Sequence, residues 1–331
     1  MKSILFDSRS AYLTRLSGWE RVTQELGKRV VGTHNGLCVE ELRIRNYGHH
    51  GLLVSDMLTM PRKSRNFDLV HFPTFPPVKL SNLSRPMLYT LFDLTWWKFP
   101  ETSSKLGKFY YKPLAQKYLD SEHHVLTPSE TSRQEISEYF GINQNRITTI
   151  YPGVVNCDCS TESPSRGKPF LLTVGTIEPR KNLPLLIRAF QDSGIANQFD
   201  LKVVGRFGWG GKLPEGVIVL SDVDDTELHG LYSDCFAVAQ PSLYEGFGLP
   251  LIEALAHGKL LICSDIPVFR EIVGNFGLFV NPLALDDWVD ILRDLVHLQY
   301  SPKESKNFAK RYNWDESANE LLTLYHTIAD H

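Results

Sequence analysis

Two glutamates, Glu245 and Glu253, stand eight positions apart in the segment SLYEGFGLPLIEALAHG. Glu245 follows an apolar run that predicts a buried strand, and Gly246 and Gly248 allow the backbone to approach a ligand closely. Pro250 suits the first turn of a helix, so the loop would bring a carboxylate and several backbone N–H groups to a helix N-terminus. Sugar hydroxyls and phosphate oxygens bind well at such a place, and Glu253 within the helix could accept both hydroxyls of a ribose.

The alternative is an ordinary strand–turn–helix connection with two surface acids, but the Gly-Phe-Gly insert between the acids favours a binding loop. Arg180 and Lys181 form a second candidate site. They follow another predicted strand and precede a predicted helix, so two cations meet a helix N-terminus.

Motifs of other nucleotide-binding and metal-binding classes are incomplete. After Gly208 and Gly210, Leu213 stands where a dinucleotide-binding G-x-G-x-x-G loop needs its third glycine, and no Gly-Lys pair is followed by the Ser or Thr of a P-loop. Dehydrogenases and P-loop enzymes are therefore disfavoured. Cys157 and Cys159 form a C-x-C without a second Cys or His pair, so we interpret them as reduced linker residues rather than a metal site.

Short apolar runs alternate with amphipathic helical patterns, which is typical of βαβ units and parallel sheets. In the first half, strands are predicted at 3–6, 69–72, 87–91, 125–127 and 147–151, and helices at 18–31, 103–119 and 129–140. In the second half, strands are predicted at 170–175, 201–205, 217–220, 236–240 and 260–264, and helices at 183–192, 226–233, 250–257, 285–298 and 314–328. Residues 157–168 lose this periodicity and fill with Ser, Pro and charge, which predicts a linker between two α/β domains.

The composition agrees with two ordinary globular domains, because the chain has 331 residues, 42% of them hydrophobic and 22% charged. No run of about 18 apolar residues suggests a membrane span. The N-terminus turns polar after six residues, too early for a secretory signal, so a cytoplasmic location is expected. Five cysteines, an odd number, do not indicate a disulfide framework.

The net charge of −3 hides an asymmetry between the halves of the chain. Residues 1–150 hold 20 Lys and Arg against 14 Asp and Glu, or +6, and the remainder holds 15 against 24, or −9. The two halves could therefore meet different partners, although simple variation between domains would give the same numbers.

The segment with the two glutamates resembles the Glu-x7-Glu motif of retaining GT-B glycosyltransferases, specifically glycosyltransferase family 4 of the glycosyl transferases group 1 type. The resemblance covers nearly the whole chain. VGTIEPRKNLPLLIRAF is similar to the family's diphosphate-binding segment, and TPSETSRQEISEYFGINQNRITTIYPGV to the segment before its domain linker. SDIPVFREIVG and GLFVNPLALDDW resemble its C-terminal domain, and SGWERV its N-terminal glycine loop.

The resemblance implies an α/β protein of the GT-B fold, with two Rossmann-like doubly wound domains facing a central cleft. Residues 1–156 would form the acceptor-side domain, and residues 169–311 the domain that binds the nucleotide-sugar donor. The family sends its C-terminal helix back onto the first domain. Residues 312–331 should do so here, through an apolar stripe at helical spacing that consists of Trp314, Leu321, Leu322, Tyr325 and Ile328.

The resemblance also implies roles for individual residues. Arg180 and Lys181 would neutralise the donor diphosphate and stabilise the leaving group, with no bound metal or other cofactor. Glu245 would act at the donor sugar and Glu253 at the ribose, and Gly18 would let its loop lie against the phosphates. The donor sugar would also be held by the backbone N–H groups of Phe247, Gly248 and Leu249.

The family's pattern fails at one place, because members commonly carry His-Asp where this chain has Phe92 and Asp93. That histidine normally faces the donor sugar and supports the developing charge, and Asp93 remains as a substrate-binding candidate. His71, at the end of a predicted strand, is the best substitute that the sequence offers.

Two further segments have a functional and a plain interpretation. Asp222, Asp224 and Asp225 superficially resemble the metal-binding Asp-x-Asp motif of the other major glycosyltransferase fold, but we interpret them as a loop that caps the next helix. The stretch 96–117 mixes aromatic residues with lysines, which suits peripheral contact with an anionic membrane face or, alternatively, a solvated basic helix. Binding to nucleic acid is disfavoured by the negative net charge.

The sequence thus predicts a retaining, metal-independent hexosyltransferase. It would move a hexose, with mannose from GDP-mannose as first choice and UDP-linked hexoses next, to a sugar on a lipid-linked glycan in envelope polysaccharide synthesis. Two rival hypotheses are a GT-B nucleotide-sugar epimerase and a non-catalytic nucleotide-sugar-binding protein.

Overall fold

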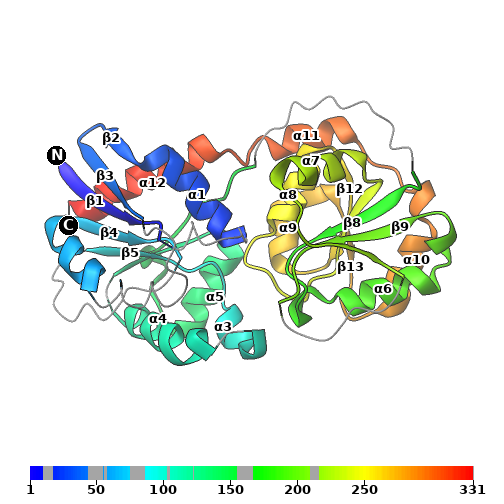
Figure 1. Ribbon diagram of the computed structural model, residues 1–331, viewed down its shortest axis with the longest axis horizontal. Coiled ribbons are helices and arrows are strands. Elements are labelled where there is room, and N and C mark those ends of the chain that lie inside the picture. The colour runs from blue at the N-terminus through cyan, green and yellow to red at the C-terminus, as the bar shows by residue number, and fades with distance from the viewer. Residues whose placement is uncertain are drawn as a thin grey trace. The chain divides into compact units, whose positions relative to one another are not determined.

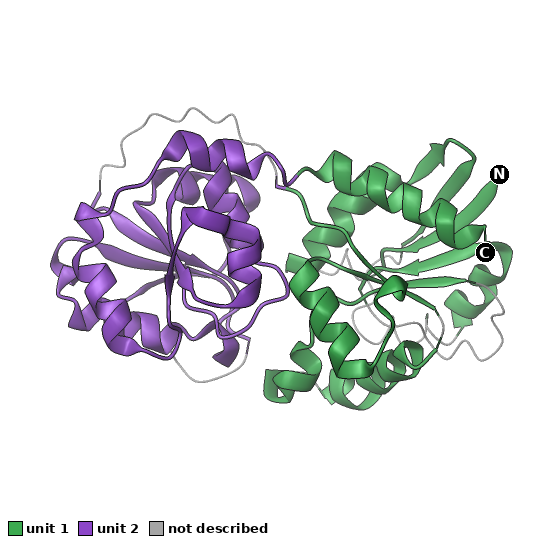
Figure 2. Ribbon diagram, turned by 180° about the vertical axis from the view of Figure 1, so that it is seen from behind, with its two compact units in different colours: residues 1–153, 313–331 green, residues 154–312 purple. Residues whose placement is uncertain are grey.

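The computed structural model describes residues 1–9, 18–43, 55, 58–74, 86–102, 105–121, 123–154, 167–208 and 216–330. The chain divides into two compact units, residues 1–153 with 313–331 and residues 154–312 (Figure 2). Most of the expected linker, with Cys157 and Cys159, lies outside the described residues. Within the described ranges, no helix is both long enough and apolar enough to cross a membrane.

Unit 1 is built on a sheet whose strands have the order β2-β3-β1-β4-β5-β6-β7. The strands are β1 (Lys2–Asp7), β2 (Gly32–His34), β3 (Leu37–Leu42), β4 (Leu69–Phe72), β5 (Met87–Thr90), β6 (His124–Thr127) and β7 (Ile147–Thr149). Neighbouring strands are parallel except β2, which pairs antiparallel with β3. In the described part of unit 1, the labelled α-helices are α1 (Gly18–Val30), α3 (Thr95–Lys98), α4 (Lys112–Leu119), α5 (Glu130–Phe140) and α12 (Trp314–Ala329), and residues 58–63 are also helical.

The last helix, α12, belongs to unit 1 and packs on α1, β1 and β4 (Figure 1). Its residues Trp314, Leu321 and Tyr325 are buried, whereas Leu322 and Ile328 are half-buried. Ser317 Oγ donates a hydrogen bond to the carbonyl oxygen of Tyr151 at 2.6 Å. At its other end the helix meets the start of the chain, because Lys2 Nζ donates to the carbonyl oxygen of Ala329 at 2.6 Å.

Unit 2 is built on a sheet whose strands are all parallel and have the order β10-β9-β8-β11-β12-β13. The strands are β8 (Phe170–Val174), β9 (Asp200–Val204), β10 (Ile218–Leu220), β11 (Ala237–Gln240), β12 (Leu260–Ser264) and β13 (Gly277–Val280). The α-helices are α6 (Leu183–Asp192), α7 (Asp225–Asp234), α8 (Leu249–Ala256), α9 (Pro267–Val273), α10 (Leu285–Arg293) and α11 (Pro302–Ala309).

The strand order of unit 2 reverses between β8 and β11. The chain proceeds from β8 outward to β9 and β10, then returns to the other side of β8 for β11, β12 and β13. Loops that leave the carboxyl ends of two such strands diverge and form a crevice, where doubly wound sheets bind their ligands. The residues that follow β8 and β11 are therefore the first place to look for a site.

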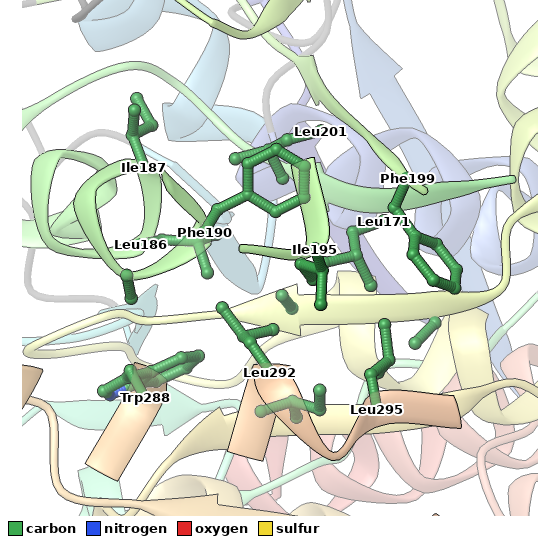
Figure 3. Close-up of a cluster of buried hydrophobic side chains, with 14 of the residues drawn as sticks. Leu171, Leu186, Ile187, Phe190, Ile195, Phe199, Leu201, Trp288, Leu292 and Leu295 are labelled. Carbon is green, nitrogen blue, oxygen red and sulfur yellow. The ribbon is translucent and has the colours of Figure 1, made fainter. Parts of the chain in front are cut away.

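A cluster of buried hydrophobic side chains packs the helices of unit 2 against its sheet (Figure 3). Phe190 of α6 and Trp288 and Leu292 of α10 are buried together with Leu171 of β8 and Leu201 of β9. Burying a large apolar side chain contributes about 1.5–3 kcal/mol, so this cluster holds α6 and α10 firmly on the sheet. The start of α6 is thereby fixed directly after the loop that follows β8.

Candidate active site

The loops after β8 and β11 bring the predicted catalytic residues together. Arg180 and Lys181 lie in a short 3₁₀ helix, Pro179–Lys181, and Glu245 follows β11. The backbone N–H of Leu243 donates to the carbonyl oxygen of Arg180 at 2.8 Å, which ties the two loops to each other.

Ion pairs connect the side chains of this cluster. Arg180 Nη1 donates to Glu245 Oε2 at 2.7 Å, and Lys181 Nζ donates to Glu245 Oε1. On its other side, Arg180 Nε lies 2.5 Å from Glu178 Oε1. Glu178, Lys181 and Glu245 are each only 8% exposed. The side chains of Arg180, Lys181, Glu178 and Glu245 thus form a largely buried charged cluster at the switch point of the sheet of unit 2.

Burial and the neighbouring charges both shift the pKa values of the groups in this cluster. Burial alone would raise the pKa of Glu245, but the charges of Lys181 and Arg180, with hydrogen bonds from Lys181 and Ser242, lower it to about 2. Burial raises the pKa of Glu178, against the effect of Arg180. Burial also lowers the pKa of Lys181, and Glu245 opposes that shift. Glu245 is therefore a fixed anion at neutral pH.

A chain of hydrogen bonds, which was not predicted from the sequence, connects Glu245 to strands β11 and β8. Ser242 Oγ donates to Glu245 Oε1 at 2.8 Å, and Gln240 Nε2 donates to Ser242 Oγ at 3.3 Å. Gln240 Oε1 in turn lies 3.5 Å from Thr173 Oγ1 on the neighbouring strand β8. The sequence signal for this chain of hydrogen bonds was weak, because Gln240 is the single polar residue at the end of β11 and Ser242 follows after Pro241.

Glycines shape both loops. Gly175 has a φ of 150°, and a Cβ there would lie 3.3 Å from Lys181 Nζ, so the lysine side chain rests against the glycine backbone. Gly248 precedes α8 with a φ of 122°, and a Cβ there would lie 2.8 Å from Ile272 and 2.9 Å from Phe269. A residue with a Cβ at position 248 would therefore have a strained backbone and would displace these two side chains.

Phe247 turns its ring into unit 2, where it is 6% exposed and packs against Tyr312 with ring centroids 5.8 Å apart. The backbone of Phe247, rather than its ring, is therefore what this segment can offer a ligand. Gly248 and Leu249 follow at the start of α8, where the first N–H groups of a helix have no acceptor four residues earlier.

Glu253 lies one turn further along α8 and is 8% exposed. Its Oε2 accepts a hydrogen bond of 2.8 Å from the hydroxyl of Tyr232, a fully buried residue of α7. Tyr232 could not be recognised from the sequence, because a tyrosine near the end of an amphipathic helix is normally a core residue.

Gly18 and Asp93 belong to unit 1 and are not part of the cluster in unit 2. Gly18 is the first residue of α1. Asp93 follows β5, and its Oδ1 accepts a hydrogen bond of 2.7 Å from the backbone N–H of Thr95. Phe92 lines a pocket at the carboxyl ends of the strands of unit 1, together with Thr90 and Thr127.

His71 does not suit the role of the histidine that Phe92 replaces. It is fully buried within β4, where Nδ1 lies 2.6 Å from the hydroxyl of Tyr325 and Nε2 lies 2.8 Å from Thr90 Oγ1. Burial lowers the pKa of His71 to about 3. It is a neutral core histidine that ties α12 to the sheet.

The plain interpretation of the acidic segment at Asp222 is confirmed. Asp224 caps α7 by accepting from the backbone N–H of Glu227 at 2.8 Å, and Glu227 Oε2 accepts from the N–H of Asp224 at 3.0 Å. This reciprocal pair is a capping box. In the described part of the chain, no group of three or more His, Cys, Asp or Glu is arranged to hold a metal ion.

Known proteins have sequences similar to that of this chain. The O-antigen chain mannosyltransferase RfbU of Salmonella typhimurium is 30% identical over 243 residues, covering 70% of this chain and 67% of the relative. The O-antigen chain mannosyltransferase B of Escherichia coli is 29% identical over 263 residues, covering 71% and 69%.

Solved structures with low sequence identity share the fold. Anabaena Alr3699/HepE, solved in complex with UDP and glucose, has a TM-score of 0.72 at 19% identity and covers 99% of this chain and 100% of that chain. WaaG, a glycosyltransferase involved in lipopolysaccharide biosynthesis, has a TM-score of 0.64 at 14% identity and covers 96% and 94%.

Two family models match successive parts of the chain. Residues 18–155 match the model described as Glycosyltransferase Family 4, and residues 161–313 match the one described as Glycosyl transferases group 1. The two Rossmann-like sheets, whose strands are parallel except for β2, and the similarity to these relatives support the same family assignment. The chain belongs to the glycosyl transferases group 1 family and is a glycosyltransferase of the GT-B fold.

Proposed function

We propose that the protein transfers a hexose, with mannose as first choice, from a nucleoside diphosphate sugar to a glycan acceptor, with retention of anomeric configuration. The buried cluster of Arg180, Lys181 and Glu245 at the switch point of unit 2 is the observation that carries this proposal. The names of the two O-antigen chain mannosyltransferases support the choice of sugar and a role in envelope polysaccharide synthesis. GDP is the first choice of nucleotide, and the UDP-bound HepE structure keeps UDP as the second.

Within this proposal, unit 2 is the donor domain and unit 1 the acceptor domain. The diphosphate binds Arg180 and Lys181, which form ion pairs with Glu178 and Glu245 in the structure. An arriving diphosphate therefore competes with two carboxylates for the hydrogen atoms of the cations. When the nucleotide leaves, Glu178 and Glu245 pair with Arg180 and Lys181 again. Product release therefore leaves neither buried cation without an opposite charge.

The sugar lies against Glu245 and the N–H groups of Phe247, Gly248 and Leu249, and Glu253 binds the ribose. Gly18 and Asp93 of unit 1 remain substrate-binding candidates, as the family resemblance implies. The bond from C1 of the sugar to the phosphate oxygen breaks, and the acceptor oxygen bonds to C1 from the same face. The acceptor proton passes to the departing phosphate, whose charge Arg180 and Lys181 stabilise. This course of reaction is the one that the family resemblance implies.

The donor site gives the first prediction. Arg180→Ala or Lys181→Ala should weaken binding of GDP or UDP by roughly ten- to a hundredfold, because each charge-assisted hydrogen bond is worth about 1.5–3 kcal/mol. Isothermal titration measures the affinity. Arg188→Ala is the control. The side chain of Arg188 in α6 is 71% exposed and forms an ion pair with Asp192, one turn further along the same helix. Loss of nucleotide binding in EDTA would contradict the metal-free site.

The proposed acceptor is a lipid-linked glycan, which the protein would meet through the stretch 96–117. Here Trp97 packs on Phe140, with ring centroids 5.0 Å apart, and Tyr111 is buried. Phe109 is 81% exposed and lies between the lysines of this stretch. A membrane contact would thus rest on Phe109 and the exposed lysines rather than on the tryptophans.

The second prediction tests this contact. Phe109→Asp should reduce co-sedimentation with vesicles of phosphatidylglycerol and phosphatidylethanolamine by at least about threefold, because it places a negative charge where an aromatic ring would enter anionic headgroups. Leu283→Asp is the matched control, since Leu283 is 78% exposed in unit 2. Equal loss in both variants, or no binding by the unmodified protein, would contradict a specific contact at Phe109.

One experiment separates the proposed function from its rivals. The protein is incubated with GDP-mannose or UDP-glucose, with and without a lipid-linked oligosaccharide, and the products are separated. A transferase makes the extended glycan only when acceptor is present, an epimerase changes the donor without acceptor, and a binding protein changes neither. The relatives named above give no support to epimerisation.

A further inference from the structure

A buried tyrosine is directed at the carboxylate of Glu253. Tyr232 has no exposed surface, and its hydroxyl donates to Glu253 Oε2 at 2.8 Å. The two residues come from different helices, α7 and α8. A phenol hydroxyl in such a place must find a partner, and here the partner is a carboxylate that the proposed function assigns to the ribose.

A stack of rings fixes the position of Tyr232. Its ring lies on His257 with centroids 5.3 Å apart and an interplanar angle of 27°, and His257 stacks on His229 at 5.2 Å and 29°. His257 Nδ1 also donates to the backbone carbonyl oxygen of Glu253 at 2.8 Å. The backbone and the side chain of Glu253 are therefore both held, one by His257 and the other by Tyr232.

The hydrogen bond leaves the carboxylate able to bind more donors. The two oxygens of an ionised carboxylate have about four acceptor positions, so a bond to Tyr232 is compatible with two bonds from a vicinal diol. A glutamate side chain that lacks such an anchor samples more rotamers and loses that freedom when it binds a ligand. Anchoring one oxygen in advance removes part of this cost and sets the direction of the other.

We propose that Tyr232 is a positioning residue that orients Glu253 toward the two ribose hydroxyls, so that the donor site selects ribonucleotides through this one buried hydrogen bond. The inference rests on the proposed function, because it requires a nucleotide in unit 2. It predicts an effect on ribose recognition that a general loss of packing would not give.

The test compares GDP and UDP with their 2′,3′-dideoxy forms by isothermal titration, and the readout is the ratio of the two affinities. The unmodified protein should prefer the ribonucleotide at least about tenfold, as expected for two bonds to a charged acceptor. Tyr232→Phe should reduce that preference at least about threefold. Glu253→Ala should remove it, and Tyr232→Phe combined with Glu253→Ala should have no further effect on it.

Tyr325→Phe is the matched control, because Tyr325 is also fully buried and its hydroxyl bonds a single side chain, His71. It should lose stability and keep the full ribose preference. If Glu253→Ala does not fold, Glu253→Gln replaces it, since the amide oxygen can still accept from Tyr232 while one of its positions toward the ribose becomes a donor.

The outcomes separate the inference from the proposed function. An unchanged ribose preference in Tyr232→Phe overturns the inference, and so does an unmodified protein that binds both forms of nucleotide equally. Failure of the unmodified protein to bind either GDP or UDP overturns the proposed function itself. A reduced preference in Tyr232→Phe that is absent from Tyr325→Phe supports the positioning role.

Discussion

Glu245→Gln should lower the rate of sugar transfer at least about a hundredfold and the free energy of unfolding by about 3 kcal/mol. The rate falls because the variant loses a charge fixed beside the reacting sugar, and such groups are worth roughly 10²–10³ in turnover. Stability falls because Arg180 and Lys181 would face a neutral amide in a buried place, and breaking a buried ion pair is costly. Transfer assays and urea denaturation measure the two effects.

The same variant should change the response to acid. The pKa of Glu245 is lowered from an ordinary 4.5 to about 2 in the folded protein. A depressed folded pKa contributes stability that is present above pH 4.5 and is lost as the pH falls toward 2. The shift corresponds to about 3 kcal/mol. Glu245→Gln should therefore be less stable than the unmodified protein at neutral pH and lose less stability between pH 4.5 and 2.

Asp265→Asn is the control for both measurements. Asp265 pairs with Arg270 through Oδ2 and Nη2 at 2.7 Å, but both side chains are exposed. Exposed pairs contribute about 0–1 kcal/mol, so this variant should show little loss of stability. Normal turnover in Glu245→Gln would contradict the role of Glu245, and equal stability losses in the two variants would contradict the buried ion pair as the cause.

Removal of residues 313–331 should leave a chain of low solubility with no measurable transfer activity. The deletion removes α12, with its buried Trp314, Leu321 and Tyr325, and uncovers apolar surface on α1, β1 and β4. Each buried side chain contributes about 1.5–3 kcal/mol. Their sum is comparable with the total stability of an ordinary domain, about 5–15 kcal/mol. Soluble yield, binding of a hydrophobic dye and transfer activity are the measurements.

A milder variant separates packing from the loss of one polar contact. Tyr325→Phe keeps the ring of α12 in place and removes only its bond to His71, so it should lose about 1–3 kcal/mol of stability and remain soluble. A truncated chain that stays soluble and active would contradict the importance of α12. The same behaviour in Tyr325→Phe as in the truncation would show that the hydrogen bond, not the apolar stripe, holds the helix.

Hydrophobic periodicity predicted most elements of both sheets, because a buried parallel strand is a short apolar run whatever surrounds it. Helix α6 and strands β4 and β12 have the predicted bounds. Strand β3 was not predicted, because Glu40 and Glu41 interrupt the apolar signal although Leu37 and Val39 are buried. Strands β2 and β13 and helices α9 and α11 were not predicted either.

The candidate site was predictable where the chemistry is local. Glu245, Gly248 and Glu253 lie within one continuous segment, whose residue types indicate a binding loop. The contact of that segment with Arg180 and Lys181 depends on β8 and β11 being neighbours, and strand order does not follow from periodicity. The family resemblance predicts that both segments bind the donor, and the order of the strands explains why the two segments contact each other.

Contacts between distant helices could not be predicted. Tyr232 and Glu253 are 21 positions apart, and only the packing of α7 against the end of α8 brings the hydroxyl to the carboxylate. His71 shows the opposite error, because a histidine at the end of a strand has the residue type of a catalytic group. Its burial beneath α12 depends on a helix 254 positions away in the sequence.

The division of unit 1 between both ends of the chain has a consequence for synthesis on the ribosome. Residues 1–153 emerge first, but their partner α12 begins only after residues 154–312 have been made. At roughly 5–20 residues per second, the surface of α1, β1 and β4 waits about 10–30 s for its cover. Unit 2 is continuous in the sequence and can close during that interval. During that interval the nascent unit 1 therefore exposes the apolar surface that α12 later covers.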